Sequence, residues 1–338
     1  MAQTPTTPVR LKDIARDLNV SVMTVSKVVR GCADVGAETR SRVMARIKEL
    51  NYQPNWVARS LAARRTFIIG LIVPDLMHSF FAEIAKGVSS TIRPLGYDVV
   101  ICNSEEDGAV EASEVDRLLA RQVDGLLIAS AQPPHSVDLF ERIEARGVPY
   151  VLVDRRFADS SAPYVGADDE AIGRLATRHL LDRGCRRIAH IAGRPLTPGA
   201  GRLKGYRDAL AAARVTVPDS FVEHASDDAT GYEAARRLLA LPTRPDAIFG
   251  YNDPTAAGAM KAILENGLRI PEEIKVIGVG NVHYSDLLRV PLSTIDQSSA
   301  SIGEQAADML IKSIGAKRRR PGKTVLIDPI LVERESTR

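Results

Sequence analysis

The sequence predicts a two-part protein in which a small all-α head precedes a larger α/β body. The first 66 residues hold three short amphipathic patterns with helical spacing. From residue 67 onward, short apolar runs alternate with amphipathic stretches of helical length, which favours parallel sheets covered by helices. The alternation is too long for one sheet, and 338 residues exceed one ordinary core. We therefore expect two similar doubly wound subdomains with a cleft between them.

Charge is distributed unevenly between the two parts. Residues 1–66 contain 12 Lys and Arg against 5 Asp and Glu, whereas residues 67–338 contain 33 against 37. A small basic head on a mildly acidic body indicates that the head meets a polyanion. Residues 1–8, rich in Thr and Pro, are expected to be disordered.

The head has the pattern of a helix-turn-helix. A first helix is predicted over 11–18, and Asn19 stands where a tight turn needs a left-handed residue. Ser21 is suited to cap a second helix in which Val25, Val28 and Val29 face inward. A third helix over 37–50 completes a small core. This arrangement places the second helix in the major groove of DNA.

The outward side of the second helix is unusual for a solvated surface, since it carries Val22 and Met23. On a recognition helix these side chains would contact thymine methyl groups, and Lys27 would reach a guanine edge or a phosphate. The residues expected to contact DNA here are Ser21, Val22, Met23, Thr24, Ser26 and Lys27.

Two stretches of the head, LKDIARDLNVSVMTVSKVV and ETRSRVMARIKELNYQPNWVARSLAARRT, resemble the LacI/GalR family of bacterial transcription regulators. The resemblance implies a DNA-binding domain over 9–53 and a hinge over 54–66 that becomes helical in the minor groove. Leu61 matches the family leucine that wedges into the central base step, with Asn55 and Ala58 beside it. An apolar wedge unstacks and kinks DNA, and a flexible CG step would make that easier.

The body, 67–338, shows a regular order of predicted elements. Strands are expected at 67–73, 97–102, 125–128, 150–153, 187–192, 247–251, 275–279 and 293–296. Helices are expected at 80–95, 110–121, 172–183, 203–214, 232–241, 256–266 and 302–314. Polar residues follow most strands, and open α/β sheets bind ligands at those strand ends. Together with the aromatic side chains of Phe80 and Phe81, they predict a pocket for a small polar ligand.

The family resemblance extends over the body and implies a periplasmic-binding-protein-like core. Crossings between subdomains are expected near 165, 294 and 325. These give an N-subdomain of about 67–165 and 295–325 and a C-subdomain of about 166–294 and 326–338. A homodimer is expected, because no leucine-heptad extension follows residue 330. The implied partners are double-stranded operator DNA and a small sugar or sugar derivative.

Effector-binding positions are carried over from the family motifs. They fall in PDLMHSFFAEI, LVDRR, GAGRLKGY, YNDPTAAG and GVGN, at Asp75, Ser79, Phe80, Asp154, Arg155, Arg202, Asn252, Asp253, Gly280 and Asn281. The planar fork of Arg202 suits a carboxylate or a pair of hydroxyl groups. Gly280 and Ala167 stand where the family commonly has aspartate, and this loss of carboxylates favours an anionic effector such as a sugar acid or phosphosugar.

Other functions are excluded or disfavoured. No apolar run reaches the length of a membrane span, and the N-terminus lacks a signal-peptide core, so a cytoplasmic protein is expected. The three cysteines, Cys32, Cys102 and Cys185, lack metal spacing, and neither a metal nor a cofactor is expected. No catalytic motif appears, and the six histidines are scattered, so an enzyme is not expected. The alternative is a solute-binding protein with the same body fold, which the basic head disfavours.

Overall fold

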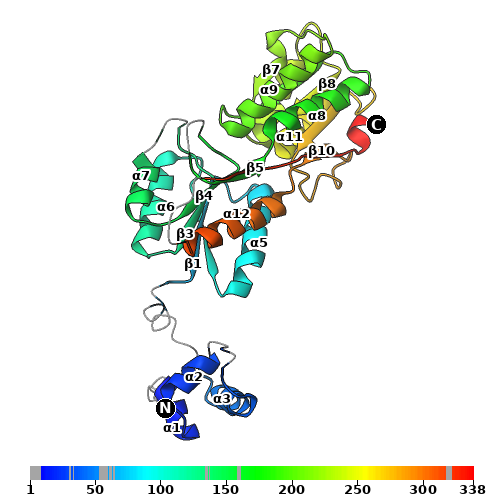
Figure 1. The fold of residues 1–338 in the computed structure, drawn as a ribbon. Coiled ribbons are helices and arrows are strands. Elements are labelled where there is room, and N and C mark those ends of the chain that lie inside the picture. Colours follow the sequence, from blue (N-terminus) through cyan, green and yellow to red (C-terminus); the bar gives the residue numbers. More distant parts are fainter. Residues whose placement is uncertain are drawn as a thin grey trace, which may run out of the picture. The chain divides into compact units, whose positions relative to one another are not determined.

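The computed structural model describes residues 9–29, 32, 34–52, 60, 63, 65–133, 136, 138–157, 161–316 and 322–338. The chain divides into two compact units, Met1–Thr66 and Phe67–Arg338, which are drawn in Figure 1. The predicted disordered segment 1–8 and most of the predicted hinge lie outside the described residues. No helix in the described part is both long and apolar enough to cross a membrane.

The head contains the three predicted helices, α1 (Leu11–Leu18), α2 (Val22–Val29) and α3 (Ala37–Glu49). Their shared core is made of buried side chains from all three helices: Ile14, Ala15, Val25, Val28 and Val43. A core this small contributes little to the stability of the head, so polar contacts at the helix ends also hold the three helices together. The Arg46 guanidinium on α3 donates to Asp17 of α1 at 2.6 Å, and Arg42 donates to the Leu18 carbonyl at 3.2 Å.

The turn between α1 and α2 is as predicted. Asn19 adopts a left-handed conformation, with φ 52° and ψ 46°, which ends α1. The Ser21 hydroxyl accepts a hydrogen bond from the Thr24 backbone N–H at 3.0 Å and so caps α2. These two local features fix the short connection that defines a helix-turn-helix.

The first lobe of the body is a parallel six-stranded sheet of order β11-β5-β4-β3-β1-β2. Its strands are β1 (Ile68–Val73), β2 (Asp98–Asn103), β3 (Gly125–Ile128), β4 (Tyr150–Val153), β5 (Tyr164–Ala167) and β11 (Thr324–Ile327). One face packs against α5 (Ser79–Ile92) and α12 (Ser299–Ile314), and the other against α6 (Gly108–Ala120) and α7 (Asp138–Ala145). Figure 1 shows the sheet between these helix pairs.

The second lobe repeats the design with the order β12-β10-β9-β8-β6-β7. Its strands are β6 (Ile188–Ala192), β7 (Val222–His224), β8 (Ala247–Gly250), β9 (Lys275–Val279), β10 (Ser293–Asp296) and β12 (Ile330–Val332). Helices α8 (Asp169–Asp182) and α9 (Thr197–Ala212) cover one face, and α10 (Asp228–Leu239) and α11 (Asp253–Glu265) the other. Only β12 runs antiparallel to its neighbour among these described strands.

The chain passes between the lobes at three places, namely from β5 to α8, from β10 to α12 and from β11 to β12. Each connection is only a few residues long, so the strands of both sheets end close to the same boundary. The cleft between the lobes therefore lies beyond strand ends, where α/β folds bind their ligands.

Close helix packing positions the second lobe's share of the cleft. A Cβ atom added to Gly173 on α8 would lie 2.2 Å from the Arg202 carbonyl oxygen on α9, and one added to Gly205 would lie 2.2 Å from the Glu170 carbonyl oxygen. This reciprocal contact lets the two helix backbones approach each other. As a result, the Arg202 side chain reaches Asp169 at the start of α8.

The predicted fold class, an all-α head with two doubly wound subdomains, is confirmed. The element pattern was incomplete, however. The sequence reading missed β5, β7, β11, β12 and α7, and it began most body helices two to six residues late. β7, β11 and β12 are edge strands whose side chains are partly exposed, so they lack a run of buried apolar residues. β5, with the sequence YVGA, has only two bulky apolar side chains.

Candidate effector-binding cleft and DNA-binding helix

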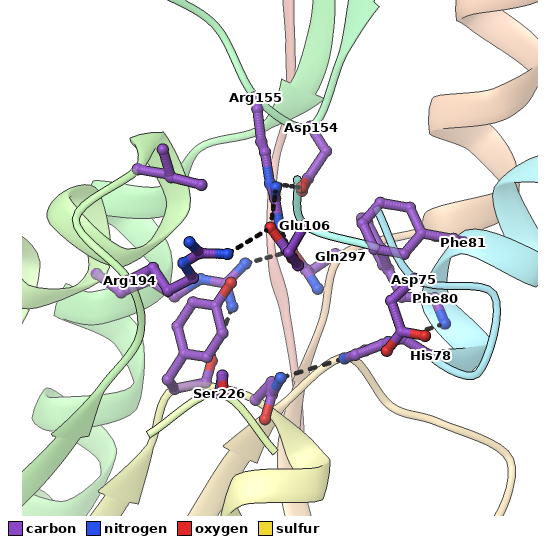
Figure 2. Close-up of a pocket in the computed structure, with 14 residues that line it drawn as sticks. Asp75, His78, Phe80, Phe81, Glu106, Asp154, Arg155, Arg194, Ser226 and Gln297 are labelled. Carbon is purple, nitrogen blue, oxygen red and sulfur yellow. Dashed lines mark hydrogen bonds and ion pairs between the residues drawn. The ribbon is translucent and has the colours of Figure 1, made fainter. Parts of the chain in front are cut away.

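One cleft between the lobes gathers charged, polar and aromatic side chains (Figure 2). It is lined by residues from both lobes: Asp75, His78, Phe80, Phe81, Glu106, Asp154, Arg155, Arg194, Leu196, Arg202, Ser226, Tyr251, Asn252 and Gln297. Three carboxylates stand beside three guanidinium groups, so the formal charges of this lining balance. A site of this kind offers hydrogen-bond donors and acceptors together with an aromatic surface.

Six predicted effector positions lie together in this lining, namely Asp75, Phe80, Asp154, Arg155, Arg202 and Asn252. The other four, Ser79, Asp253, Gly280 and Asn281, lie outside it. Ser79 begins α5 just after His78, and His78 takes the cleft position instead. Gly280, with φ 128°, lies in the turn after β9, where its N–H donates to the Ile295 carbonyl.

Asp253 and Asn281 support the cleft from behind. The fully buried Asp253 carboxylate accepts hydrogen bonds from the Thr294 and Ser285 hydroxyls at 2.6 and 2.7 Å and from the Val282 N–H at 3.0 Å. The Asn281 amide is engaged on both sides, by Asp296 at 3.0 Å and by Arg334 at 2.7 Å. Both residues therefore hold the loop after β9.

Arg202 is the most firmly fixed side chain of the second lobe's wall. Its side chain is 3% exposed. Nε donates to Asp169 at 3.0 Å, Nη1 to the Tyr251 carbonyl at 2.7 Å and Nη2 to Gln297 at 2.6 Å. Burial raises the pKa of Asp169 to about 7, and the Arg202 charge opposes this rise. Because each guanidinium nitrogen donates one hydrogen bond to the protein, the group is held in one orientation. The second N–H of Nη1 or Nη2 can then donate to a ligand.

The first lobe places a second arginine opposite. Arg155 follows β4, and its two terminal nitrogens donate to the two carboxylate oxygens of Glu106 at 2.8 and 2.6 Å. Asp154 beside it is buried and left-handed, with φ 62°. Burial raises the pKa of the Asp154 carboxyl, although the Arg155 and Arg202 charges counter it.

His78 and Asn252 bring two hydrogen-bond donors face to face. The His78 Nδ1 atom accepts from the Phe80 N–H at 3.3 Å, and burial lowers the pKa of His78 to about 4. The neutral ring therefore carries its proton on Nε2. Asn252 Oδ1 accepts from the Thr255 N–H, which points Nδ2 at His78 Nε2, 3.2 Å away. Two N–H donors do not hydrogen-bond to each other. A ligand oxygen placed between them could accept a hydrogen bond from each.

Among the described residues, the Arg194–Glu106 and Thr197–Arg156 pairs form hydrogen bonds between the lobes at the cleft, and His78 and Asn252 lie 3.2 Å apart there. Arg194, after β6, donates to Glu106 at 3.0 Å. The Thr197 hydroxyl at the start of α9 accepts from the Arg156 N–H at 3.1 Å and donates to its carbonyl at 2.6 Å. These contacts all lie at the cleft, so any change there alters how the lobes are joined.

Phe81, which the sequence associated with the pocket, lies in the lining beside Phe80. Seven other lining residues were not among the predicted effector positions: His78, Glu106, Arg194, Leu196, Ser226, Tyr251 and Gln297. Most of them could have been found from their place just after a strand, because Ser226 follows β7 and Tyr251 follows β8. Glu106 lies three residues beyond the end of β2, in the acidic run SEED, where a solvated turn was an equally good interpretation.

The predicted recognition helix exposes the expected side chains. Val22 and Met23 are 47% and 62% exposed. Ser26 and Lys27 are half-buried, and the Lys27 ammonium forms an ion pair with Asp34. The Ser21 and Thr24 hydroxyls lie 2.8 Å apart at the start of the helix. The hinge positions Asn55, Ala58 and Leu61 lie outside the described residues.

Within the described part of the chain, no group of three or more His, Cys, Asp or Glu residues is arranged to hold a metal ion. The fold and the cleft define a class of protein: a two-lobed ligand-binding body attached to a helix-turn-helix head.

Comparison with known proteins makes the assignment specific. Residues 66–335 match the periplasmic binding proteins and sugar binding domain of the LacI family, and residues 10–55 match the bacterial regulatory proteins of the lacI family. The chain is 36% identical to the ribose operon repressor of Escherichia coli (strain K12) over 330 residues, covering 96% of this chain and 99% of the relative. It is 36% identical to the transcriptional repressor PurR of Klebsiella pneumoniae (strain 342), covering 96% of each.

A solved structure of the Lac repressor dimer, bound to operator and the anti-inducer ONPF, is similar over 98% of this chain and 99% of that one, with a TM-score of 0.84 and 29% identity. The chain belongs to the LacI family of bacterial regulators. It is a transcription regulator with a DNA-binding head and an effector-binding body.

Proposed function

We propose that this regulator is a repressor that binds a pseudo-palindromic operator as a homodimer and is controlled by a carbohydrate-like effector in the interlobe cleft. Relatives that cover nearly the whole chain are named repressors, and a similar solved structure is a repressor dimer on its operator. Two-fold symmetry of the protein matches two-fold symmetry of such a site.

The composition of the cleft carries the effector proposal. Sugars present many hydroxyl groups, each both a donor and an acceptor, together with apolar ring faces. The cleft supplies carboxylates, guanidinium groups and amides from both lobes, and the Phe80 ring for an apolar face. Asp75, Asp154, Arg155, Arg202 and Asn252 are the proposed polar contacts.

The charge of the effector is less constrained than its hydroxyl content. The sequence-based preference for an anion rested on Gly280 and Ala167, which stand in place of carboxylates. Glu106, however, brings another carboxylate into the cleft lining, and Asp169 pairs with Arg202 beside it. A sugar, a sugar acid and a phosphosugar are therefore all proposed members of the effector class.

DNA contact is proposed for two elements of the head. Ser21, Thr24, Ser26 and Lys27 of the α2 region would bind phosphates or base edges, while Val22 and Met23 contact thymine methyl groups. Lys27 would then exchange its ion pair with Asp34 for a contact with DNA. In the hinge, Leu61 is proposed as the minor-groove wedge, flanked by Asn55 and Ala58.

Control follows from the joined lobes. An effector that binds one arrangement of the lobes better than another shifts the population toward it, and a coupling of about 1–3 kcal/mol is typical. The contacts of Arg194 with Glu106 and of Thr197 with Arg156 are those that such a shift would change.

We further propose a cytoplasmic location and no catalytic activity, as fits a regulator that meets chromosomal DNA. The alternative is a solute-binding protein of the same body fold. It would not account for the exposed apolar side chains on α2.

The test is fluorescence anisotropy of the full chain on a labelled fragment from its own upstream region, against scrambled DNA, over a salt series and with neutral sugars, sugar acids and phosphosugars. The proposal predicts preference for the upstream fragment, affinity that falls steeply with salt, and a shift with one ligand class. Equal, weak binding to both DNAs would favour the solute-binding alternative.

A further inference from the structure

The Glu106 carboxylate is held by two arginines from different lobes. Arg155, in the same lobe, grips it with both terminal nitrogens at 2.6 and 2.8 Å, and Arg194 reaches it from the opposite lobe at 3.0 Å. Figure 2 shows the carboxylate between these two guanidinium groups. No other carboxylate of the lining contacts both arginines in the described part of the chain.

The loop that carries Glu106 is built in a costly conformation. Glu105 and Glu106 are both left-handed, with φ 52° and 57°, a region that side chains with a Cβ atom adopt reluctantly. The loop is tied to the end of β1, because the Ser104 N–H donates to the Val73 carbonyl at 2.9 Å and the Glu106 N–H donates to the Pro74 carbonyl at 3.1 Å. Strain that the surrounding structure maintains at a ligand site points to a role there.

The Glu106 carboxylate is ionised at neutral pH. Burial alone would raise its pKa, but the hydrogen bonds and charges of Arg155 and Arg194 outweigh burial and lower it. It therefore presents a full negative charge to the two guanidinium groups. A ligand carboxylate or phosphate would use the same two oxygen positions on the Arg155 fork.

We propose that Glu106 is the specificity-determining residue of the effector site: it takes the anion position on Arg155 and Arg194 and so selects neutral, hydroxylated effectors over carboxylates and phosphates. An anion entering the cleft has to displace Glu106 and then lies beside the displaced charge and beside Asp154. A neutral hydroxyl group faces neither cost, since it can donate to Glu106 and accept from Arg202. The inference rests on the proposed effector-binding function of this cleft.

The test uses inorganic phosphate as the probe, titrated into the full-length protein by calorimetry in a phosphate-free buffer at constant ionic strength. Glu106→Gln keeps the size of the side chain and removes its charge. The matched control is Glu105→Gln, which removes the same charge from the neighbouring exposed residue of the same loop. We expect Glu106→Gln to bind phosphate at least tenfold more tightly than the unaltered protein, and Glu105→Gln to match the unaltered protein.

A double variant, Glu106→Gln with Arg155→Gln, should lose the gain, which would locate the phosphate on the Arg155 fork. Glu106→Ala serves as a second variant should the glutamine variant fold poorly. Equal phosphate affinity in the Glu106 variants and the unaltered protein, or an equal gain in Glu105→Gln, would overturn the inference. If a sugar still shifts DNA binding in that case, the proposed function survives; if no ligand shifts it, the proposed function fails independently.

Discussion

The two walls of the cleft are built differently. The second lobe presents Arg202 and Asn252 from α9 and from the start of α11, where each is fixed from behind by buried partners. The first lobe presents Glu106, Asp154 and Arg155 from loops after strands, two of them in left-handed conformations. The wall from the second lobe is held in place by buried hydrogen bonds. The wall from the first lobe consists of loops with left-handed residues, held by ion pairs between their own side chains. The difference suggests that the second lobe fixes ligand position while the first lobe sets selectivity.

The largest expected effect is a difference in stability between variants of Arg202 and variants of Arg155. Arg202→Leu leaves Asp169 buried without its partner and should lower the free energy of unfolding by about 3–5 kcal/mol. Arg155→Leu should cost less, because its partner Glu106 has a side chain that is 31% exposed and can be hydrated. Urea unfolding of both variants measures the difference. Adding Asp169→Asn to Arg202→Leu should restore part of the lost unfolding free energy. Equal losses in Arg202→Leu and Arg155→Leu would show that the two walls do not differ in this way.

The wall from the second lobe also depends on the α8–α9 contact. Gly173→Ala forces a Cβ atom against the Arg202 carbonyl, so we expect a loss of about 2 kcal/mol in unfolding free energy together with weaker effector binding. Gly315→Ala is the control, since the nearest atom to its added Cβ is 3.9 Å away. Thermal unfolding and effector titration of both variants provide the measurement. A Gly173→Ala protein as stable as the control would show that the two helices can separate freely.

Acid should destabilise both lobes through neutral buried histidines. Burial lowers the pKa of His78 to about 4 and that of His190 to about 3, against 6.5 when unfolded. Below pH 6.5 the unfolded state binds a proton at each of these histidines and the folded state does not. The free energy of unfolding therefore falls as the pH is lowered from 6.5 toward the pKa of the folded state. Each histidine should cost up to about 1.4 kcal/mol per pH unit in that window.

The measurement is the free energy of unfolding between about pH 7 and pH 4.5, the window in which these histidines gain protons on unfolding. His190→Gln, which cannot titrate, should flatten the decline relative to the unaltered protein, and His78→Gln should do the same. His224→Gln changes an exposed histidine and serves as the control. A decline of unchanged slope in His190→Gln would mean that its buried ring does not contribute to acid sensitivity.

The smallest effect concerns loop strain. Glu105→Gly should stabilise the protein by about 1 kcal/mol, because glycine adopts a positive φ without a Cβ penalty. Glu105→Ala removes the same charge but keeps the Cβ atom, so it should bring no such gain. Comparison of their unfolding midpoints in urea separates the two contributions. A gain of the same size in both variants would assign the effect to charge instead.

The fold class could be predicted from the sequence because the longer strands and helices carry clear apolar periods. Apolar periodicity also placed the start of most body helices too late in the sequence, and the reason is physical. Their first turns begin at polar caps such as Asp107, Asp168 and Asn252, which apolar periodicity does not register. In α11, which starts at Asp253, such a turn lies at the cleft, so the error fell partly on the functional region.

The candidate site was predictable only where a side chain directly follows a strand or matches a family motif, as Asp154 and Arg202 do. The pairing of Arg202 with Asp169, 33 residues earlier, depends on the α8–α9 contact and leaves no local signal. Asp253 illustrates the converse. Its motif pointed to the ligand, but its buried hydrogen bonds to Ser285 and Thr294 give it a supporting place.

The proposed function requires that effector binding in the cleft changes DNA binding by the head. The most direct test measures operator affinity of the unaltered protein and of Arg202→Gln by fluorescence anisotropy, with and without the ligand that the sugar panel identifies. At a temperature where circular dichroism shows both proteins folded, we expect the ligand to shift the operator affinity of the unaltered protein and to leave that of Arg202→Gln unchanged. An equal shift in Arg202→Gln would contradict this requirement, because control would then not pass through this cleft.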